Sequence, residues 1–307
     1  WNINDKHRLT FNHKDVYGTD LRGSSSDRNT VALYSARYIK SEETTTNSFH
    51  LVSDLADNLI SEVYVSTKET ATDQVSPAGQ NMPSITIDEA FGYEFVAGPD
   101  IFRMANDLDT ETNFFKAKLT YYQNNHKITA GFENSVYDTY NVFIVDEDGS
   151  FEFDDLAALQ AGQFSSYSAS GAKTGNVADA AADFEYELTS MYLMDEYTIS
   201  DTMTLTYGIR YDEYSGDDTP TNASFQNKYG FKNRGIKGTD LLTYRVGLDI
   251  MLDDLSDLNI TYGTYSAKLP NVWISNAYTN TGTNIANYNS AYGGCPQTGL
   301  YLSLIHI

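Results

Sequence analysis

The stretch YLMDEYTISDTMTLTYGIRYD, residues 192–212, indicates the fold of the whole chain. From Met203 to Asp212 apolar and polar residues alternate strictly, which is the period of a β-strand with one apolar and one polar face. Residues 184–197 are also strand-like, and only the polar break 199–202 separates the two strands. A strand that crosses a bilayer on a tilt needs about 9–11 residues, and both of these strands are long enough.

The same strand–turn–strand pattern recurs along the chain. Each predicted turn contains Asn or Asp, whose side chains stabilise turns through local hydrogen bonds, and the turns lie at Asn2–Lys6, Asp54–Asn58, Gln123–His126, Ser200–Thr202 and Asp253–Asp257. About nine strands are predicted, at residues 7–18, 42–53, 59–67, 112–122, 127–137, 184–198, 203–213, 241–252 and 258–267.

Long connections alternate with these short turns. They are expected at Thr19–Ser41, Lys68–Asp109, Asp138–Asp183 and Ser215–Thr239, although residues 31–39 are also compatible with a strand. Consecutive antiparallel strands place successive connections at opposite ends of a sheet. Short turns at one end and long loops at the other are typical of an outer-membrane barrel. A soluble sandwich or propeller is the alternative, but its connections would not sort so strictly.

The predicted fold is therefore all-β, an antiparallel up-and-down meander that forms part of a transmembrane β-barrel. The apolar residues of two adjacent strands should face lipid, namely Leu205, Tyr207, Ile209, Leu242, Tyr244, Val246, Leu248 and Ile250. The polar residues between them should face the lumen, among them Thr206, Arg210, Arg245 and Asp249.

The composition excludes several classes of protein. The net charge of −22 argues against nucleic-acid binding, which requires a basic surface. No window has the length and apolarity of a transmembrane helix. The 24 Tyr and 15 Phe suit strands and interfacial girdles. Cys295 is the single cysteine, so a disulfide within the chain and a cysteine-based metal cluster are both excluded.

The two ends of the sequence look incomplete. The chain starts at Trp1 without a signal peptide, which suggests a missing N-terminal region. The last six residues, LSLIHI (302–307), resemble a translated sequencing adapter. We therefore expect one domain, a partial outer-membrane β-barrel over residues 1–301, followed by an artefactual tail over 302–307.

Three stretches resemble the barrel of TonB-dependent outer-membrane receptors, in particular the Oar-like, OmpA-related branch. They are FRMANDLDTETNFFKAKLTYYQNNHKITAGFEN (102–134), the hairpin at 192–212, and LPNVWISNAYTNTG (269–282). The first and third resemble the Oar-like branch more specifically, and the resemblance extends over nearly all of residues 1–301. It implies nine strands of a plugged barrel of about 22 strands. The plug domain, the TonB box and the closing strand of the family are not found here.

No constellation of catalytic residues is evident. His7, His13, His50 and His126 are scattered without metal-ligand spacing, and His306 lies in the suspected tail. No G-x-S-x-G or phosphate-binding loop occurs. Residues 146–150, DEDGS, resemble part of a calcium loop but fit an Asp-Gly turn better. Residues 153–161 are compatible with a short helix that ends at Gly162. We therefore predict no enzyme, no cofactor, and no catalytic, cofactor-binding or metal-binding residue.

Acidic and tyrosine residues leave two interpretations open. Lys173 is the only basic residue between Ile128 and Ile209, a span that includes Asp146, Glu147, Asp148, Glu152, Asp154 and Asp155. This acidic region is either a solvated surface or a field that gathers cations. The tyrosines near strand ends suit either interfacial belts or ligand contacts: Tyr17, Tyr121, Tyr122, Tyr137, Tyr140, Tyr211 and Tyr214.

The resemblance implies a receptor in the outer membrane of a Gram-negative bacterium. Such a receptor moves a substrate with energy that TonB transmits through the plug. Its expected partners are outer-membrane lipid and lipopolysaccharide, the TonB complex through the plug region, and a substrate that the sequence does not identify. The alternative is a non-transporting outer-surface protein that uses its long loops for binding or adhesion.

Overall fold

The computed structural model describes residues 1–79, 81–216, 220, 222–279 and 281–291. Cys295, His306 and the predicted adapter tail at 302–307 lie outside the described residues. Within the described part, no helix is long and apolar enough to cross a bilayer.

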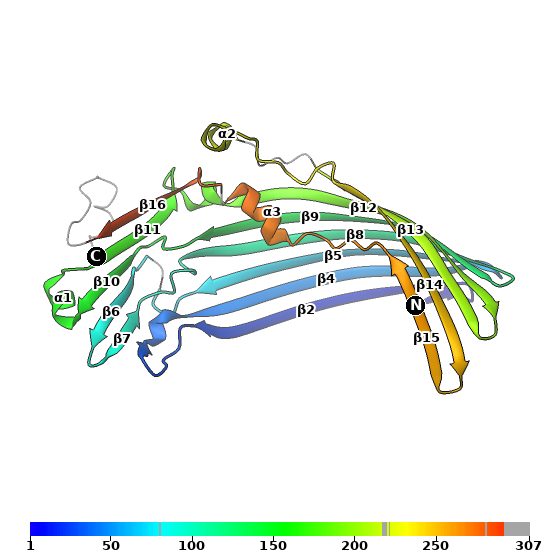
Figure 1. Cartoon of the computed structure of the whole chain (residues 1–307), viewed down its shortest axis with the longest axis horizontal. Coiled ribbons are helices and arrows are strands. Elements are labelled where there is room, and N and C mark those ends of the chain that lie inside the picture. The colour runs from blue at the N-terminus through cyan, green and yellow to red at the C-terminus, as the bar shows by residue number, and fades with distance from the viewer. Residues whose placement is uncertain (80, 217–219, 221, 280, 292–307) are drawn as a thin grey trace.

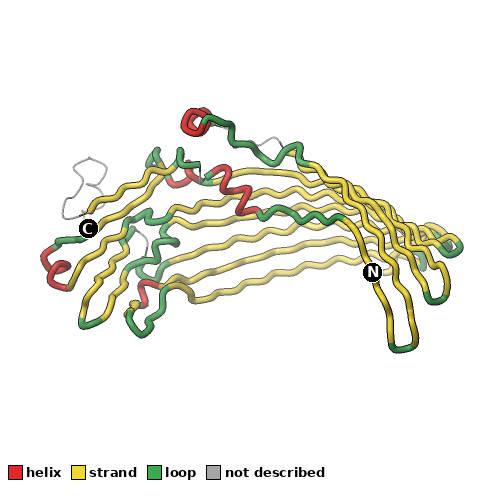
Figure 2. The backbone as a smooth tube through the Cα atoms, in the orientation of Figure 1, coloured by secondary structure: helices red, strands yellow, loops and turns green. Residues whose placement is uncertain are grey.

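One long antiparallel sheet of ten strands forms the body of the structure (Figure 1). Its spatial order follows the chain order, so it is a meander as predicted. The strands are β1 (Asn2–Asn4), β2 (His7–Gly23), β4 (Arg37–Ala56), β5 (Leu59–Val75), β8 (Ala105–Gln123), β9 (His126–Ile144), β12 (Ala182–Ser200), β13 (Met203–Ser215), β14 (Asp240–Asp253) and β15 (Ser256–Gly263). The described strands form a curved open sheet that does not close on itself (Figure 2).

The nine predicted strands are all present, but most of their bounds were wrong. The longest strands extend well past the predicted ends, always toward the long connections. For example, β8 begins at Ala105 instead of residue 112, and β9 ends at Ile144 instead of residue 137. The ninth strand is the exception, because β15 ends at Gly263 and not at 267. The additional residues are mostly polar and pair through backbone hydrogen bonds, so they lack the apolar alternation that reveals a strand.

Two-residue turns join neighbouring strands at one end of the sheet. They lie at residues 5–6, 57–58, 124–125, 201–202 and 254–255, each within a predicted turn region. Asn124 adopts a left-handed conformation with φ 54°, which Asn tolerates better than most residues. The strict alternation of short and long connections is therefore confirmed.

The long connections, predicted only as long loops with one possible strand and one short helix, contain several strands of their own. They build a second sheet beyond the far end of the first (Figure 1). Its strands are, in spatial order, β16 (Ile285–Ala291), β11 (Ser166–Ala172), β10 (Ser150–Asp155), β6 (Ser84–Ala90), β7 (Tyr93–Ala97) and β3 (Thr30–Ala32). Two of its pairs, β10 with β6 and β3 with β7, are parallel. The fold is thus a meander with a mixed cap sheet.

Short helices complete the connections. They are η1 (Tyr34–Ala36), α1 (Leu156–Ala161), η2 (Val177–Ala180), α2 (Ala223–Tyr229) and α3 (Asn271–Tyr278). Asp155 caps the start of α1 and Gly162 ends it with φ 67°, close to the predicted short helix. Apolar clusters bury Phe153 in the cap sheet and Phe184 beneath α3. On the apolar face of the main sheet, Ala105 of β8 and Val142 and Ile144 of β9 form a third buried cluster at the cap end, packed against Ala180 of η2.

Candidate functional site

The two faces of the main sheet differ in chemistry. We call them the apolar face, which includes Ile209 and Tyr244, and the polar face, which includes Arg210. Ile209 and Tyr244 are 54% and 48% exposed although both are large and apolar. Arg210, Arg245, Thr206 and Asp249 lie together on the polar face, where they line a cavity. The predicted segregation of these residues into two faces is therefore confirmed.

The apolar face is an apolar band bounded by polar residues at both ends. Near the short turns, Asp195 accepts hydrogen bonds from Tyr207 at 2.7 Å and contacts His126 at 2.8 Å. Toward the cap sheet the same face becomes acidic. There a cavity of about 480 Å³ is lined by Glu43, Glu69, Asp109, Glu111, Asp138 and Asp183. Charges are expensive in hydrocarbon, so the acidic end of this face lies beyond the lipid.

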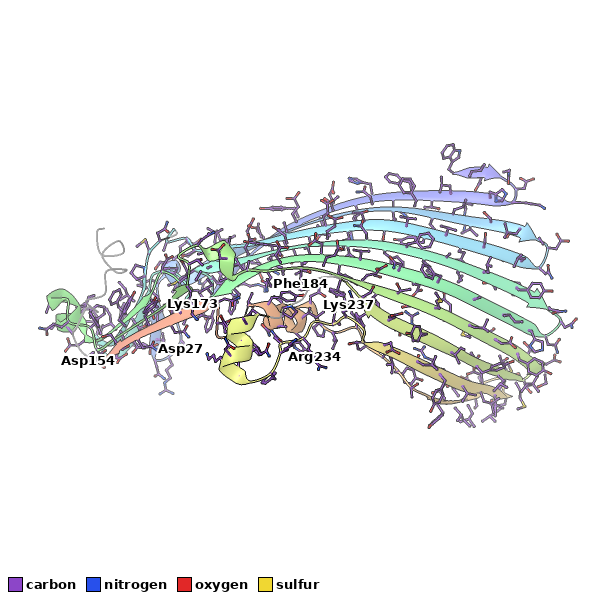
Figure 3. All side chains as sticks on the ribbon, turned by 90° about the horizontal axis from the view of Figure 1, so that it is seen from above. Asp27, Asp154, Lys173, Phe184, Arg234 and Lys237 are labelled. Atoms are coloured by element: carbon purple, nitrogen blue, oxygen red, sulfur yellow. The ribbon has the colours of Figure 1, made fainter. Side chains whose placement is uncertain are left out.

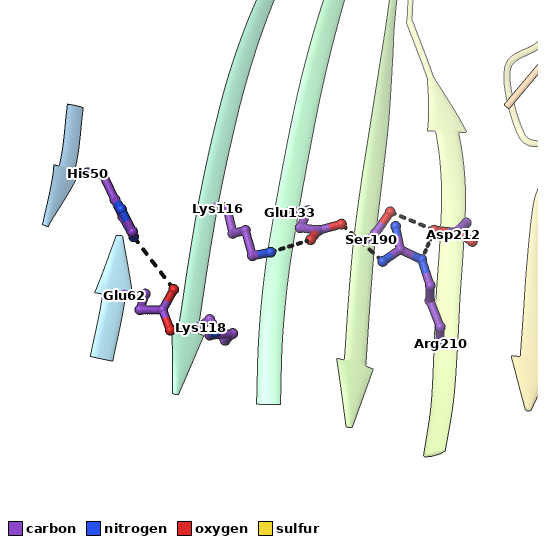
Figure 4. Close-up of polar contacts among 8 residues, drawn as sticks. All are labelled: His50, Glu62, Lys116, Lys118, Glu133, Ser190, Arg210 and Asp212. Carbon is purple, nitrogen blue, oxygen red and sulfur yellow. Dashed lines mark hydrogen bonds and ion pairs between the residues drawn. The ribbon is translucent and has the colours of Figure 1, made fainter. Parts of the chain in front are cut away.

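A row of ion pairs crosses the polar face from strand to strand (Figure 4). Glu62 on β5 lies 2.5 Å from Lys118 Nζ and 3.5 Å from His50 Nε2. Glu133 on β9 lies 3.3 Å from Lys116 Nζ and 3.0 Å from Arg210 Nη1. Each of these ion pairs joins residues on adjacent strands or on strands two apart, so the strand register of the sheet brings the charged groups together.

Arg210 forms the end of this row. Its Nε donates to Asp212 Oδ1 at 2.8 Å. Asp212 is 8% exposed and also accepts from Ser190 at 2.6 Å and from Ser266 at 3.0 Å. A buried carboxylate requires such partners. The row of charges thus connects the strands to the chain segment that follows β15.

That segment, residues 264–278, folds back over the polar face, and we call it the strap. Asn271 accepts a hydrogen bond from Tyr186 at 2.7 Å, and Asn141 donates to Ser275 at 2.7 Å. Phe184 stacks on Tyr278 with ring centroids 4.8 Å apart, and it lies beside α3 in Figure 3. The strap contains most of the 269–282 stretch that the sequence analysis singled out.

The strand-end tyrosines divide between the two faces. Tyr17 and Tyr211 are exposed on the apolar face, as belt residues would be. Tyr137 and Tyr214 pack instead around Tyr186 on the polar face. Sequence reasoning could not separate these groups because the strand ends, and hence the facing of each residue, were not known.

The histidines and the acidic connection form separate local structures. His13 contacts Asn47 and Asp15, far along the chain from His50 and His126. Within the described residues, no group of three or more His, Cys, Asp or Glu side chains could hold a metal ion.

Asp146 and Gly149 close a turn through a 3.0 Å backbone hydrogen bond, in agreement with the predicted Asp-Gly turn.

A cavity of about 940 Å³ lies on the polar face between the strap and strands β12 to β15. Its lining includes Tyr192, Arg210, Arg245, Tyr265 and Lys268. This volume lies at the upper end of the range for small-molecule sites. The sequence analysis assigned no binding residues, and it predicted only that four of the lining residues face the lumen, namely Thr206, Arg210, Arg245 and Asp249.

Residues 2–289 match the protein family described as the outer membrane beta barrel domain. The chain belongs to this family. Its place is therefore the outer membrane, with the apolar face toward lipid and the polar face toward the barrel lumen. A comparison with curated protein sequences finds no match.

Two solved structures share the architecture of this barrel section. The outer membrane transporter YddB from Escherichia coli is similar with a TM-score of 0.56 at 9% identity, covering 96% of this chain and 33% of that chain. The ferric-catecholate import receptor Fiu from Escherichia coli K12 is similar with a TM-score of 0.52 at 11% identity. The match covers 84% of this chain and 41% of that chain. The chain thus spans well under half the length of either protein, and the likeness concerns the fold.

Proposed function

We propose that the chain forms part of the wall of a TonB-dependent outer-membrane receptor of the Oar-like branch. In this proposal the complete protein moves a substrate across the outer membrane with energy transmitted by TonB. The proposed role includes no catalysis, since the acids and bases described at the centre of the polar face, such as Glu133 and Arg210, pair with one another.

The observation that best supports the proposal is the number of strands that form the charged polar face. Ten strands lie side by side, and among the described residues the edge strands β1 and β15 each pair with one neighbour only. Barrels of about eight strands fill their interior with side chains, whereas much larger barrels enclose a channel or a plug. A barrel that needs more than ten strands therefore has room for a substrate. The two similar structures are those of a transporter and an import receptor, which supports the same role.

A second candidate function is binding or adhesion at the outer surface without transport. The cap sheet favours it, because five strands from long connections, together with β16, form an ordered surface beyond the membrane wall. Such a protein would not need TonB.

Cross-linking to TonB in living cells tests the proposal. Cells that produce the full-length protein from its natural gene are treated with formaldehyde, and cross-linked TonB is detected by immunoblotting. We expect a specific product that is absent from cells lacking TonB. If a folded, surface-exposed barrel gives no such product, the transport proposal is wrong and the adhesion alternative is favoured.

A further inference from the structure

The connection between β13 and β14 carries positive charge in an otherwise acidic chain. We call residues 222–239 the basic loop, because they contain four of the 20 basic residues and none of the 42 acidic ones. The four are Lys228, Lys232, Arg234 and Lys237, and all of them are exposed. In a chain with a net charge of −22, such a loop creates a local field that attracts anions.

Acidic residues border the basic loop in the sequence. The pair Asp217–Asp218 precedes it and Asp240 follows it. Asp240 pairs with Glu213 in the register of β14 with β13, so it belongs to the sheet. Among the described residues, no carboxylate oxygen lies within 4.0 Å of the side-chain nitrogens of Lys232 or Arg234. These two cations are therefore available to an anionic partner.

Hydrogen bonds hold the basic loop beside the strap. The helix α2 begins at the Asn222 cap and ends at Gly230, where φ is 79°. Lys228 Nζ donates to the backbone oxygen of Gly282 at 3.0 Å, and the Asn233 side chain donates to a backbone oxygen of the strap. Figure 3 shows α2 (yellow) and α3 (orange) on the same side of the sheet. The basic loop therefore lies on the polar side of the wall, away from the apolar face.

Three aromatic rings form a cluster on the same loop. The ring centroid of Phe225 lies 4.7 Å from that of Tyr229 and 5.4 Å from that of Phe231. Tyr229 and Phe231 nevertheless remain 43% and 62% exposed. Lys228 Nζ lies 5.1 Å from the centroid of the Tyr229 ring, which places a cation beside the rings. Exposed rings next to exposed cations suit a ligand that has both an apolar face and negative charge.

Two exposed amides complete this surface. Gln226 and Asn227 lie on α2 between Phe225 and Lys228, and an amide side chain both donates and accepts hydrogen bonds. A sugar presents the matching groups, namely hydroxyls that donate and accept and a ring face of C–H groups that packs on aromatic rings. Carboxylates on the sugar would form charge-assisted hydrogen bonds with the cations. A long polyanion would also meet the acidic flanks, so a short one fits best.

We propose that the basic loop binds a short acidic oligosaccharide, in which Tyr229 and Phe231 pack against the sugar rings and Lys232 and Arg234 pair with the carboxylates. The ligand is soluble and is not the lipopolysaccharide of the membrane, because the loop is attached to the strap on the polar side of the wall. The inference rests on the proposed function, since it takes this loop to lie at the external mouth of a transporting barrel. It extends that function by naming the class of substrate.

Isothermal titration calorimetry on the full-length protein, purified from outer membranes in detergent, tests the inference with hexagalacturonate as the probe. The methyl ester of the probe keeps the sugars and removes the charges, and hexaglutamate keeps the charges and removes the sugars. We expect hexagalacturonate to bind more tightly than either by about 10-fold or more. Added salt should weaken this binding, because exposed charges are screened.

Variants of the basic loop separate the contributions of charge and ring. Lys232→Gln combined with Arg234→Gln should weaken binding about 10-fold, since two charge-assisted contacts are lost. Phe231→Ala should weaken it about 5- to 10-fold, whereas Phe231→Tyr, which keeps a ring, should bind normally. Lys173→Gln and Phe91→Ala are the matched controls, because both residues are exposed but lie in other connections. They should leave the affinity unchanged.

Several results would contradict the inference. Equal affinity for hexagalacturonate and its methyl ester would overturn the role of the cations, and equal affinity for hexaglutamate would overturn the sugar contact. Displacement of hexagalacturonate by lipopolysaccharide of the same strain would assign the loop to the membrane surface and overturn the soluble ligand. Absence of binding, or binding that none of the loop variants weakens, would overturn the whole inference. Calorimetry needs no TonB, so failure of the TonB cross-link and failure of ligand binding are separate results.

Discussion

Substitution of Ile209 by Arg gives a quantitative test of which face of the main sheet lies against lipid. Ile209 is 54% exposed, and its register partners Leu193 and Tyr244 are 50% and 48% exposed. All three belong to the apolar band. An arginine on the lipid face near the bilayer midplane costs about 2–4 kcal/mol. We therefore expect Ile209→Arg to lower the free energy of unfolding by about that amount.

Thr206→Arg is the matched control on the same strand. Thr206 lines the lumen-side cavity, where an added guanidinium group stays in water, so its cost should remain below about 1 kcal/mol. Unfolding of the full-length protein by urea in lipid vesicles, followed by tryptophan fluorescence, measures both variants. Equal destabilisation by the two substitutions, or a larger effect at Thr206, would refute the assignment of faces.

Two further predictions concern the polar face and the cap. Arg210→Met should lower the free energy of unfolding by about 1–2 kcal/mol in the same urea assay, because Glu133 and Asp212 each lose one partner but keep others, Lys116 for Glu133 and Ser190 and Ser266 for Asp212. Burial, with Asp148 beside it, raises the pKa of Glu147 to about 7, so the cap is stabilised below the ordinary glutamate pKa and loses that stability as pH rises through 7. The protection factors of the β10 amides, which are corrected for the intrinsic pH dependence of exchange, should therefore be lower at pH 8 than at pH 5, and a Glu147→Gln variant should lose this difference.

The membrane part of the fold could be predicted because lipid leaves a clear pattern in the sequence. Every second residue must be apolar where a strand crosses hydrocarbon, as Leu205, Tyr207 and Ile209 show. Beyond the band this requirement ends. β5, for example, continues from Val65 through Thr67 and Glu69 with the same pairing to its neighbours, but with no apolar signal. The strand ends were therefore placed too early.

The cap sheet could not be predicted for a different reason. Its pairs join segments far apart in the chain, such as β16 with β11, which lie more than a hundred residues apart. Single-sequence patterns describe local periodicity and contain no information on which distant segments pair. The site depends on the same kind of contact. Lys268 reaches Tyr137 only because the strap folds back across the sheet, and the sequence indicated the strap only as a stretch that resembles the Oar-like branch.

The topology of the wall can be measured most directly with epitope tags on intact cells that produce the full-length protein. One tag is inserted next to Gly162, at the end of α1 in a long connection, and another next to Asn125, in a two-residue turn. These barrels place short turns in the periplasm and long loops outside. Antibody should therefore stain the Gly162 tag on intact cells, and should stain the Asn125 tag only after the outer membrane is opened. Staining of the Asn125 tag alone would mean that the orientation is inverted, and staining of both tags would contradict the meander of membrane-crossing strands.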